Sequence, residues 1–167
     1  AEAIAAPPER LAEVDGMTAA SINEFKILEA GAQRFAKGKA KKRLPLGSWS
    51  EVVDYCRTAM AFSEREEFRI LFLDKRNGLI ADEVQGSGTV DHTPVYPREV
   101  VRRALELAAT ALVLVHNHPS GDPTPSTADI KMTLDIIAIA NPLGVAIHDH
   151  LIVGRHGHSS LRALKLL

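Results

Sequence analysis

Residues 111–129 read ALVLVHNHPSGDPTPSTAD, and this stretch changes character twice along its length. It opens with five apolar residues, which is typical of a short buried strand. The prolines and the glycine of 119–125 exclude both a helix and a regular strand, so the chain must pass through a loop. Ser126 is a preferred residue at helix N-termini. The stretch therefore predicts a buried strand, a tight loop and a helix in succession, as in α/β folds.

Three side chains of this stretch predict a metal site. His116 and His118 are two residues apart, and in extended backbone such side chains project from the same face. Asp129 lies in the first turn of the expected helix, from where it can reach back towards them as an anionic third ligand. Two imidazoles and a carboxylate suit one Zn²⁺ per chain, with the fourth position open to water as in catalytic zinc sites.

Each of these residues has a simpler explanation when it is taken alone. Ser126 can be a plain N-cap, and Asp129 can complement the helix dipole. Histidines at alternate positions line many strands for other reasons, but the conjunction of strand, loop and helix favours the metal. His148 and His150 repeat the spacing. These two histidines could form a second metal site. We favour the alternative, in which His150 orients a neighbouring side chain by hydrogen bonding.

The surrounding sequence alternates between helix and strand patterns, which predicts an α/β domain. A capping box at 48–51 begins a helix, 68–73 is an apolar strand, and Asn77-Gly78 predicts a hairpin turn with an antiparallel return over 79–84. A second helix starts at Pro97, and 145–153 gives the final strand or strand pair. The apolar stripe of the helix from Pro97 is expected to use Val100, Val101, Ala104, Leu105 and Ala108. The helix from Ser126 is expected to bury Ile130, Leu134, Ile137 and Ile139.

Residues 1–44 are expected to form a small helical unit apart from the domain of 45–167. Residues 15–18 (Asp-Gly-Met-Thr) mark a turn between two helices. The run 34–43 carries six cationic side chains and no acid, and we expect it to be an exposed, flexible connector. The main apolar residues of the helical unit are Leu11, Val14, Ile22, Phe25, Ile27 and Leu28.

Bulk properties narrow the class of protein. The formal net charge of −1 over 167 residues indicates neither a nucleic acid nor a membrane as the partner of the whole molecule. The apolar runs are too short to span a bilayer, and no secretory signal opens the chain. Cys56 is the only cysteine, which excludes an internal disulfide and is expected of a protein in the reducing cytoplasm.

The block from His116 to Asp129 resembles the JAMM motif of MPN-type zinc metalloproteases, in which His-x-His-Pro precedes Ser-x-x-Asp. More narrowly, 95–99 (VYPRE), 116–121 and Asp149-His150 resemble the bacterial RadC family. The resemblance covers roughly residues 48–164. It implies a cytidine-deaminase-like α/β/α fold with a mixed sheet. It also implies cleavage of peptide or isopeptide bonds in protein substrates, and an association with DNA repair.

The same resemblance implies a catalytic carboxylate and a further polar group. The family pattern Arg-Glu-x-Phe matches Glu66, which would act as the general base on a zinc-activated water. Glu67 would point to the opposite face of a regular strand, although a bulge would reverse that choice. The Ser126 hydroxyl is expected to help stabilise the tetrahedral oxyanion.

The sequence also bears on other functions of a zinc-binding protein. A zinc nucleobase deaminase needs His-x-Glu and Pro-Cys-x-x-Cys, and a zincin needs His-Glu-x-x-His, and the sequence has neither. Residues 15–20 resemble a degenerate helix-hairpin-helix, with Thr18 where a second glycine is usual, so any DNA binding should be weak. The alternative function is therefore a DNA-repair-associated adaptor whose zinc site is structural or vestigial.

Overall fold

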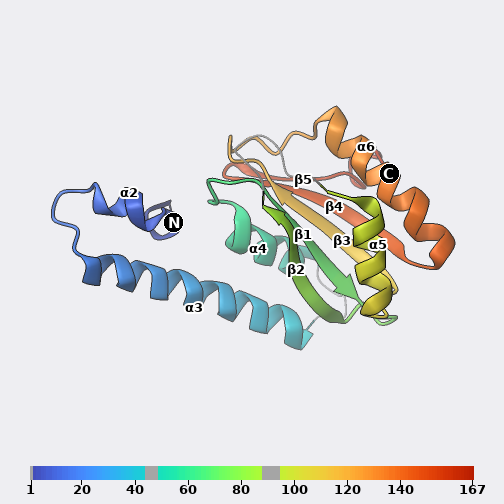
Figure 1. The fold of residues 1–167 in the computed structure, drawn as a ribbon, viewed down its shortest axis with the longest axis horizontal. Coiled ribbons are helices and arrows are strands. Elements are labelled where there is room, and N and C mark those ends of the chain that lie inside the picture. Colours follow the sequence, from blue (N-terminus) through green and yellow to red (C-terminus); the bar gives the residue numbers. More distant parts are fainter. Residues whose placement is uncertain (1, 44–48, 88–94) are drawn as a thin grey trace.

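The structure is a computed structural model that describes residues 2–43, 49–87 and 95–167. Three helices at the N-terminus, α1 (Glu2–Ala5), α2 (Pro8–Ala12) and α3 (Ala19–Arg43), lie beside a domain built on one sheet (Figure 1). No helix of these residues is both long and apolar enough to cross a membrane.

A five-stranded mixed sheet forms the centre of the domain. Its order is β2-β1-β3-β4-β5. The strands are β1 (Glu67–Leu73), β2 (Leu79–Ser87), β3 (Ala111–Asn117), β4 (Ala146–Gly154) and β5 (Gly157–Ser160). Among the described strands, β3 and β4 alone pair in parallel, and every other neighbouring pair is antiparallel. The expected Asn77-Gly78 turn joins β1 to β2, and the Asp74 carboxylate accepts hydrogen bonds from two of its amides.

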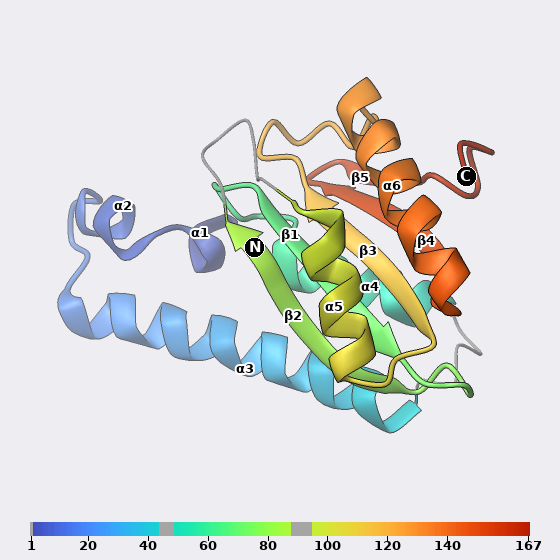
Figure 2. The ribbon, with the colours of Figure 1, turned by 45° about the vertical axis from the view of Figure 1, so that its right-hand side comes forward.

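Helices cover both faces of this sheet, as the α/β/α expectation requires. Helix α4 (Trp49–Met60) lies behind the sheet in Figure 2, whereas α5 (Pro97–Glu106) and α6 (Thr127–Ala140) lie in front of it. Side chains alternate between the faces: Leu71 and Val113 pack with α4, and Ile70 and Leu114 pack with α5 and α6. This alternation decides which side chains can meet at the end of the central strands.

The buried faces of α5 and α6 differ in part from the expected ones. Val100, Val101 and Ala104 of α5 are buried as expected, but Leu105 is half exposed, and Ala108 lies beyond the end of the helix. Helix α6 buries Thr133, Ile136 and Ala140, whereas Leu134 and Ile139 are 46% and 42% exposed. Because α6 is apolar on most of its circumference, periodicity alone does not select the face that contacts the sheet.

The prediction of a flexible connector over residues 34–43 is wrong, because helix α3 continues through them to Arg43. Ala, Lys, Arg and Gln are good helix formers and carry the helix past its two glycines. Helix α3 packs against α1, α2 and α4, so the helical unit contacts the domain. Within the unit Leu11 is buried, but Val14, Ile27 and Leu28 are more than half exposed. Residue 44, the last of the expected helical unit, and Ser48 of the expected capping box lie outside the described residues.

Candidate metal centre

The two histidines of the expected site lie at the end of the central strand β3. His116 is almost completely buried and stacks on Phe68 of β1, which places it on the sheet face that α5 and α6 cover. His118 follows the strand, and its amide donates a hydrogen bond of 2.9 Å to the Val153 carbonyl of β4. The strand pairing therefore continues long enough to hold both imidazoles.

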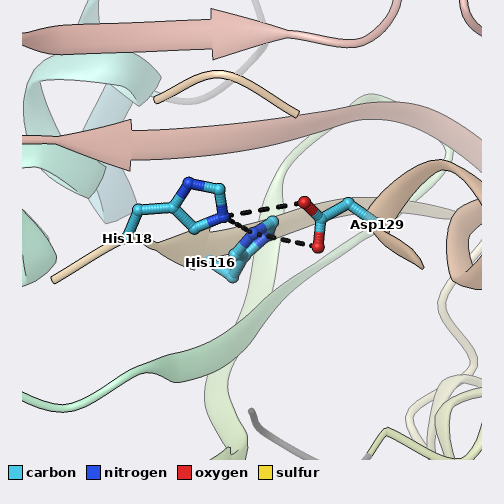
Figure 3. A group of neighbouring side chains, drawn as sticks. All are labelled: His116, His118 and Asp129. Carbon is cyan, nitrogen blue, oxygen red and sulfur yellow. Dashed lines mark hydrogen bonds and ion pairs between the residues drawn. The ribbon is translucent and has the colours of Figure 1, made fainter. Parts of the chain in front are cut away.

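Asp129 approaches the histidines from the start of α6. Ser126 is the N-cap of this helix: its hydroxyl accepts from the Asp129 amide, and the Asp129 carboxylate accepts from the Ser126 amide. This reciprocal capping fixes the carboxylate at the first turn. Figure 3 shows the result, with Asp129 and the two imidazole rings pointing towards one another.

Donor atoms of these three side chains lie at distances that suit a small divalent cation. Nε2 of His116 is 2.9 Å from Nε2 of His118 and 3.3 Å from Oδ1 of Asp129, and Nε2 of His118 is 3.6 Å from Oδ2. Nitrogen ligands about 2.0–2.1 Å from a tetrahedral zinc are separated by about 3.3 Å. The structure thus brings the three expected ligands together as a group that can hold a metal ion.

The charges within the group favour a cation at its centre. Nδ1 of His118 donates to the Asp122 carbonyl at 2.9 Å, so in the neutral ring Nε2 carries a lone pair. The nearby Asp129 carboxylate raises the pKa of His118, whereas burial lowers the pKa of His116 to about 4. Burial alone would raise the pKa of Asp129, but the nearby imidazoles of His118 and His116 lower it below its usual range. An anionic carboxylate and two ring nitrogens therefore converge.

Glu66 and Glu67 lie on opposite sides of the sheet. Glu66 lines a cavity of about 540 Å³ with His118, Ser126 and Asp129; its other lining residues include Arg10, Glu64 and Arg155. Glu67 lines a different cavity, beside α4, and its carboxylate is 3.8 Å from Arg69. Phe68 pairs with His116 without a bulge between β1 and β3. Of the two glutamates, Glu66 is therefore the one that lies on the same side of the sheet as the metal group.

A family model for the RadC-like JAB domain matches residues 46–166. The chain belongs to this family. The match begins after the end of α3, so the three N-terminal helices lie outside the part of the chain that it covers.

The loop that shapes the site in this RadC-like JAB domain depends on two glycines. Gly121 has a φ of +92°, which L side chains rarely adopt. A Cβ added to Gly154 of β4 would lie 2.2 Å from the Gly121 carbonyl oxygen. This close approach lays the loop over the end of β4 and brings the Asp122 carbonyl to His118.

Two further residues of the RadC-like JAB domain contribute to the site without a clear signal in the sequence. Asn117, which lies between the two histidines in the sequence, is buried. Its side chain forms hydrogen bonds with the backbone of the segment that carries Glu66. Thr133 of α6 contacts His150, which in turn contacts His116. His150 thus has the orienting position expected of it. His148 instead contacts Asn77, and these two histidines form no metal group among the described residues.

Proposed function

We propose that this RadC-like JAB domain is a zinc-dependent metalloprotease or isopeptidase, with a protein or peptide as its substrate. The observation that carries the proposal is the convergence of His116, His118 and Asp129 into one group, of which His118 and Asp129 line the cavity that also contains Glu66. Three protein ligands are the number typical of catalytic zinc, whereas structural zinc is normally held by four. When bound, zinc would act as a Lewis acid that polarises a carbonyl and lowers the pKa of a water molecule.

Glu66 is the proposed general base. Its carboxylate shares the cavity with His118 and Asp129 and can accept a proton from the attacking water. The same oxygen atom can then deliver that proton to the departing amine, and such general acid–base catalysis contributes roughly 10²–10⁴-fold to the rate. The group that can hold a metal ion consists of His116, His118 and Asp129, so the proposed base is distinct from the proposed ligands.

Ser126 has two competing tasks in this proposal. Its hydroxyl donates to Oδ2 of Asp129 at 2.7 Å and so helps to hold that ligand in place. To stabilise an oxyanion, the hydroxyl must rotate away from Asp129 and donate to the substrate instead. Oδ2 would still accept the hydrogen bond of 2.7 Å from the Ser126 amide, so the carboxylate keeps one partner during this exchange.

The test compares cells that produce the wild-type protein with cells that produce Glu66→Gln at the same level. Mass spectrometry of newly formed N-termini and of branched peptides should show species that depend on the wild-type protein and disappear in the variant. Substrates should accumulate on the variant, because it binds but does not cleave them. Identical termini in both cells, with both proteins metal-loaded, would instead favour the nucleic-acid-associated adaptor with a structural or vestigial site.

A further inference from the structure

A chain of hydrogen bonds leads from one member of the metal group to another through the interior of the domain. It starts at Asp129, whose backbone carbonyl is 2.6 Å from Oγ1 of Thr133 one helical turn later. A carbonyl oxygen only accepts, so the Thr133 hydroxyl must donate its single proton here. The direction of the first hydrogen bond is therefore fixed by chemistry.

The direction of this first hydrogen bond fixes the directions of the next two hydrogen bonds in the chain. Nδ1 of His150 is 2.6 Å from the same Thr133 oxygen, and because the hydroxyl proton is already committed, Nδ1 must be the donor. In a neutral ring Nε2 of His150 then carries a lone pair. Nδ1 of His116 lies 2.8 Å from Nε2 of His150 and must donate a hydrogen bond to its lone pair. Nε2 of His116 consequently has no proton, and this atom is the one that faces Asp129 and His118.

Burial supports the neutral state on which the last step depends. Thr133 and His150 are completely buried, and His116 is 1% exposed. A doubly protonated imidazole is costly in such surroundings. A doubly protonated His150 would also leave His116 to accept at Nδ1, which would direct an N–H group at the centre of the metal group.

We propose that Thr133 and His150 are positioning residues, which hold His116 in the tautomer whose Nε2 is free to bind a metal ion. This inference rests on the proposed metal centre. An imidazole exchanges between two tautomers, and the one it adopts is set by the hydrogen bond at its other nitrogen. Here that selection begins at the backbone of Asp129, so the helix that supplies the carboxylate ligand also determines the protonation of a histidine ligand on β3.

The experiment reads the tautomer directly in metal-free protein. Long-range ¹H–¹⁵N correlation spectra of the histidine rings distinguish a protonated Nδ1 from a protonated Nε2. We compare wild type, Thr133→Val, which is similar in shape but lacks the hydroxyl, and Thr133→Ser, which restores it. Thr58→Val is the matched control, because the Thr58 hydroxyl donates to the Asp54 carbonyl at 2.8 Å in the same way but at an exposed position of α4.

Wild type, Thr133→Ser and Thr58→Val should show His116 protonated only at Nδ1, and Thr133→Val should show a mixture of tautomers. Zinc affinity, measured by competition with a chelator, should fall about 10–100-fold in Thr133→Val alone, the range for loss of a partner that orients a ligand. A wild-type His116 protonated at Nε2 overturns the inference, even if Thr133→Val does not fold. So does a folded Thr133→Val with wild-type spectra and affinity. The expected tautomer in a wild-type protein that binds no metal supports the hydrogen-bonded chain and overturns the proposed function.

Discussion

The side-chain oxygen of Asn117 accepts a hydrogen bond of 2.9 Å from the backbone amide of Glu67. The amide group of the same side chain donates to the Arg65 carbonyl at 3.0 Å. Asn117 lies between the two ligand histidines and is 1% exposed. One buried side chain thus ties the segment on either side of Glu66 to the strand that carries the metal group, and strand alternation then puts Glu66 and Glu67 on opposite sides of the sheet.

The two glutamates should therefore differ in their effect on catalysis. Glu66→Gln should retain metal content and thermal stability but abolish hydrolysis of a substrate found by the proteomic comparison, because an amide does not accept the proton. Glu67→Gln should retain activity, since Glu67 lies beside α4. Turnover of both metal-loaded variants checks this. If only Glu67→Gln is inactive, the assignment by strand face is wrong; if both are fully active, the carboxylate mechanism is wrong.

Purified protein should bind about one zinc per chain. His116→Ala and Asp129→Ala should each lose most of it, whereas His148→Ala should not, because His148 contacts Asn77 instead of the metal group. Elemental analysis after dialysis gives the metal content. Zinc at 100 times its Kd should also raise the free energy of unfolding by about 2.7 kcal/mol, an increase that a chelator removes. Undiminished zinc in both ligand variants would contradict the site.

Ser126→Ala should impair stability and turnover to different extents. Loss of the N-cap should lower the free energy of unfolding by about 1 kcal/mol. Loss of one oxyanion donor should lower turnover by ~10²–10³-fold while metal remains bound. Ser126→Thr retains a hydroxyl and is the control for both measurements. A loss of stability with unchanged turnover would show that Ser126 acts as a helix cap and not in catalysis.

The buried thiol of Cys56 should make the protein sensitive to alkali. Burial, and after it the charge of Asp82, raises the pKa of this thiol from 9.0 to about 12. The unfolded chain loses the thiol proton first as the pH rises, so stability is complete below 9.0 and declines between 9.0 and about 12. For one group the slope is at most about 1.4 kcal/mol per pH unit. Urea unfolding of wild type and Cys56→Ala on both sides of pH 9.0 should show a smaller decline in the variant.

DNA binding by the N-terminal part should be weak and strongly dependent on salt. The six cations of 34–43 are the main source of positive charge there, and each phosphate contact contributes about −0.9 to the slope of log K against log salt for duplex DNA. Fluorescence anisotropy with short duplexes at several salt concentrations measures this slope. Replacing Lys39 and Lys41 with Glu should abolish binding. Tight, sequence-selective binding that persists at physiological salt would favour the adaptor function.

Much of the fold and the metal group could be predicted because their signals are local in the sequence. His116, His118 and Asp129 lie within one strand–loop–helix unit, so strand alternation and a helix cap bring them together. Strand alternation also separates Glu66 from Glu67. The sequence did not predict the full extent of α3, because a dense run of positive charge suggests a solvated connector. The same residue types nevertheless favour a helix.

The rest of the site depends on the arrangement of distant elements. Asn117 binds a segment 50 residues earlier, and Thr133 meets a histidine 17 residues later. The first contact requires β1 to pair with β3, and the second requires α6 to bury Thr133 against β4. Neither the strand order nor the buried face of a helix that is apolar on most of its circumference follows from periodicity. These partners are therefore visible only in the folded chain.

The reciprocal capping of Ser126 and Asp129 couples two equilibria that are usually separate. One carboxylate both begins α6 and completes the metal group, so fraying of the first helical turn withdraws a ligand. By thermodynamic linkage, an ion bound to Asp129 must suppress that fraying to the same degree. Amide hydrogen exchange in the first turn of α6 would therefore report whether an ion is bound to this carboxylate.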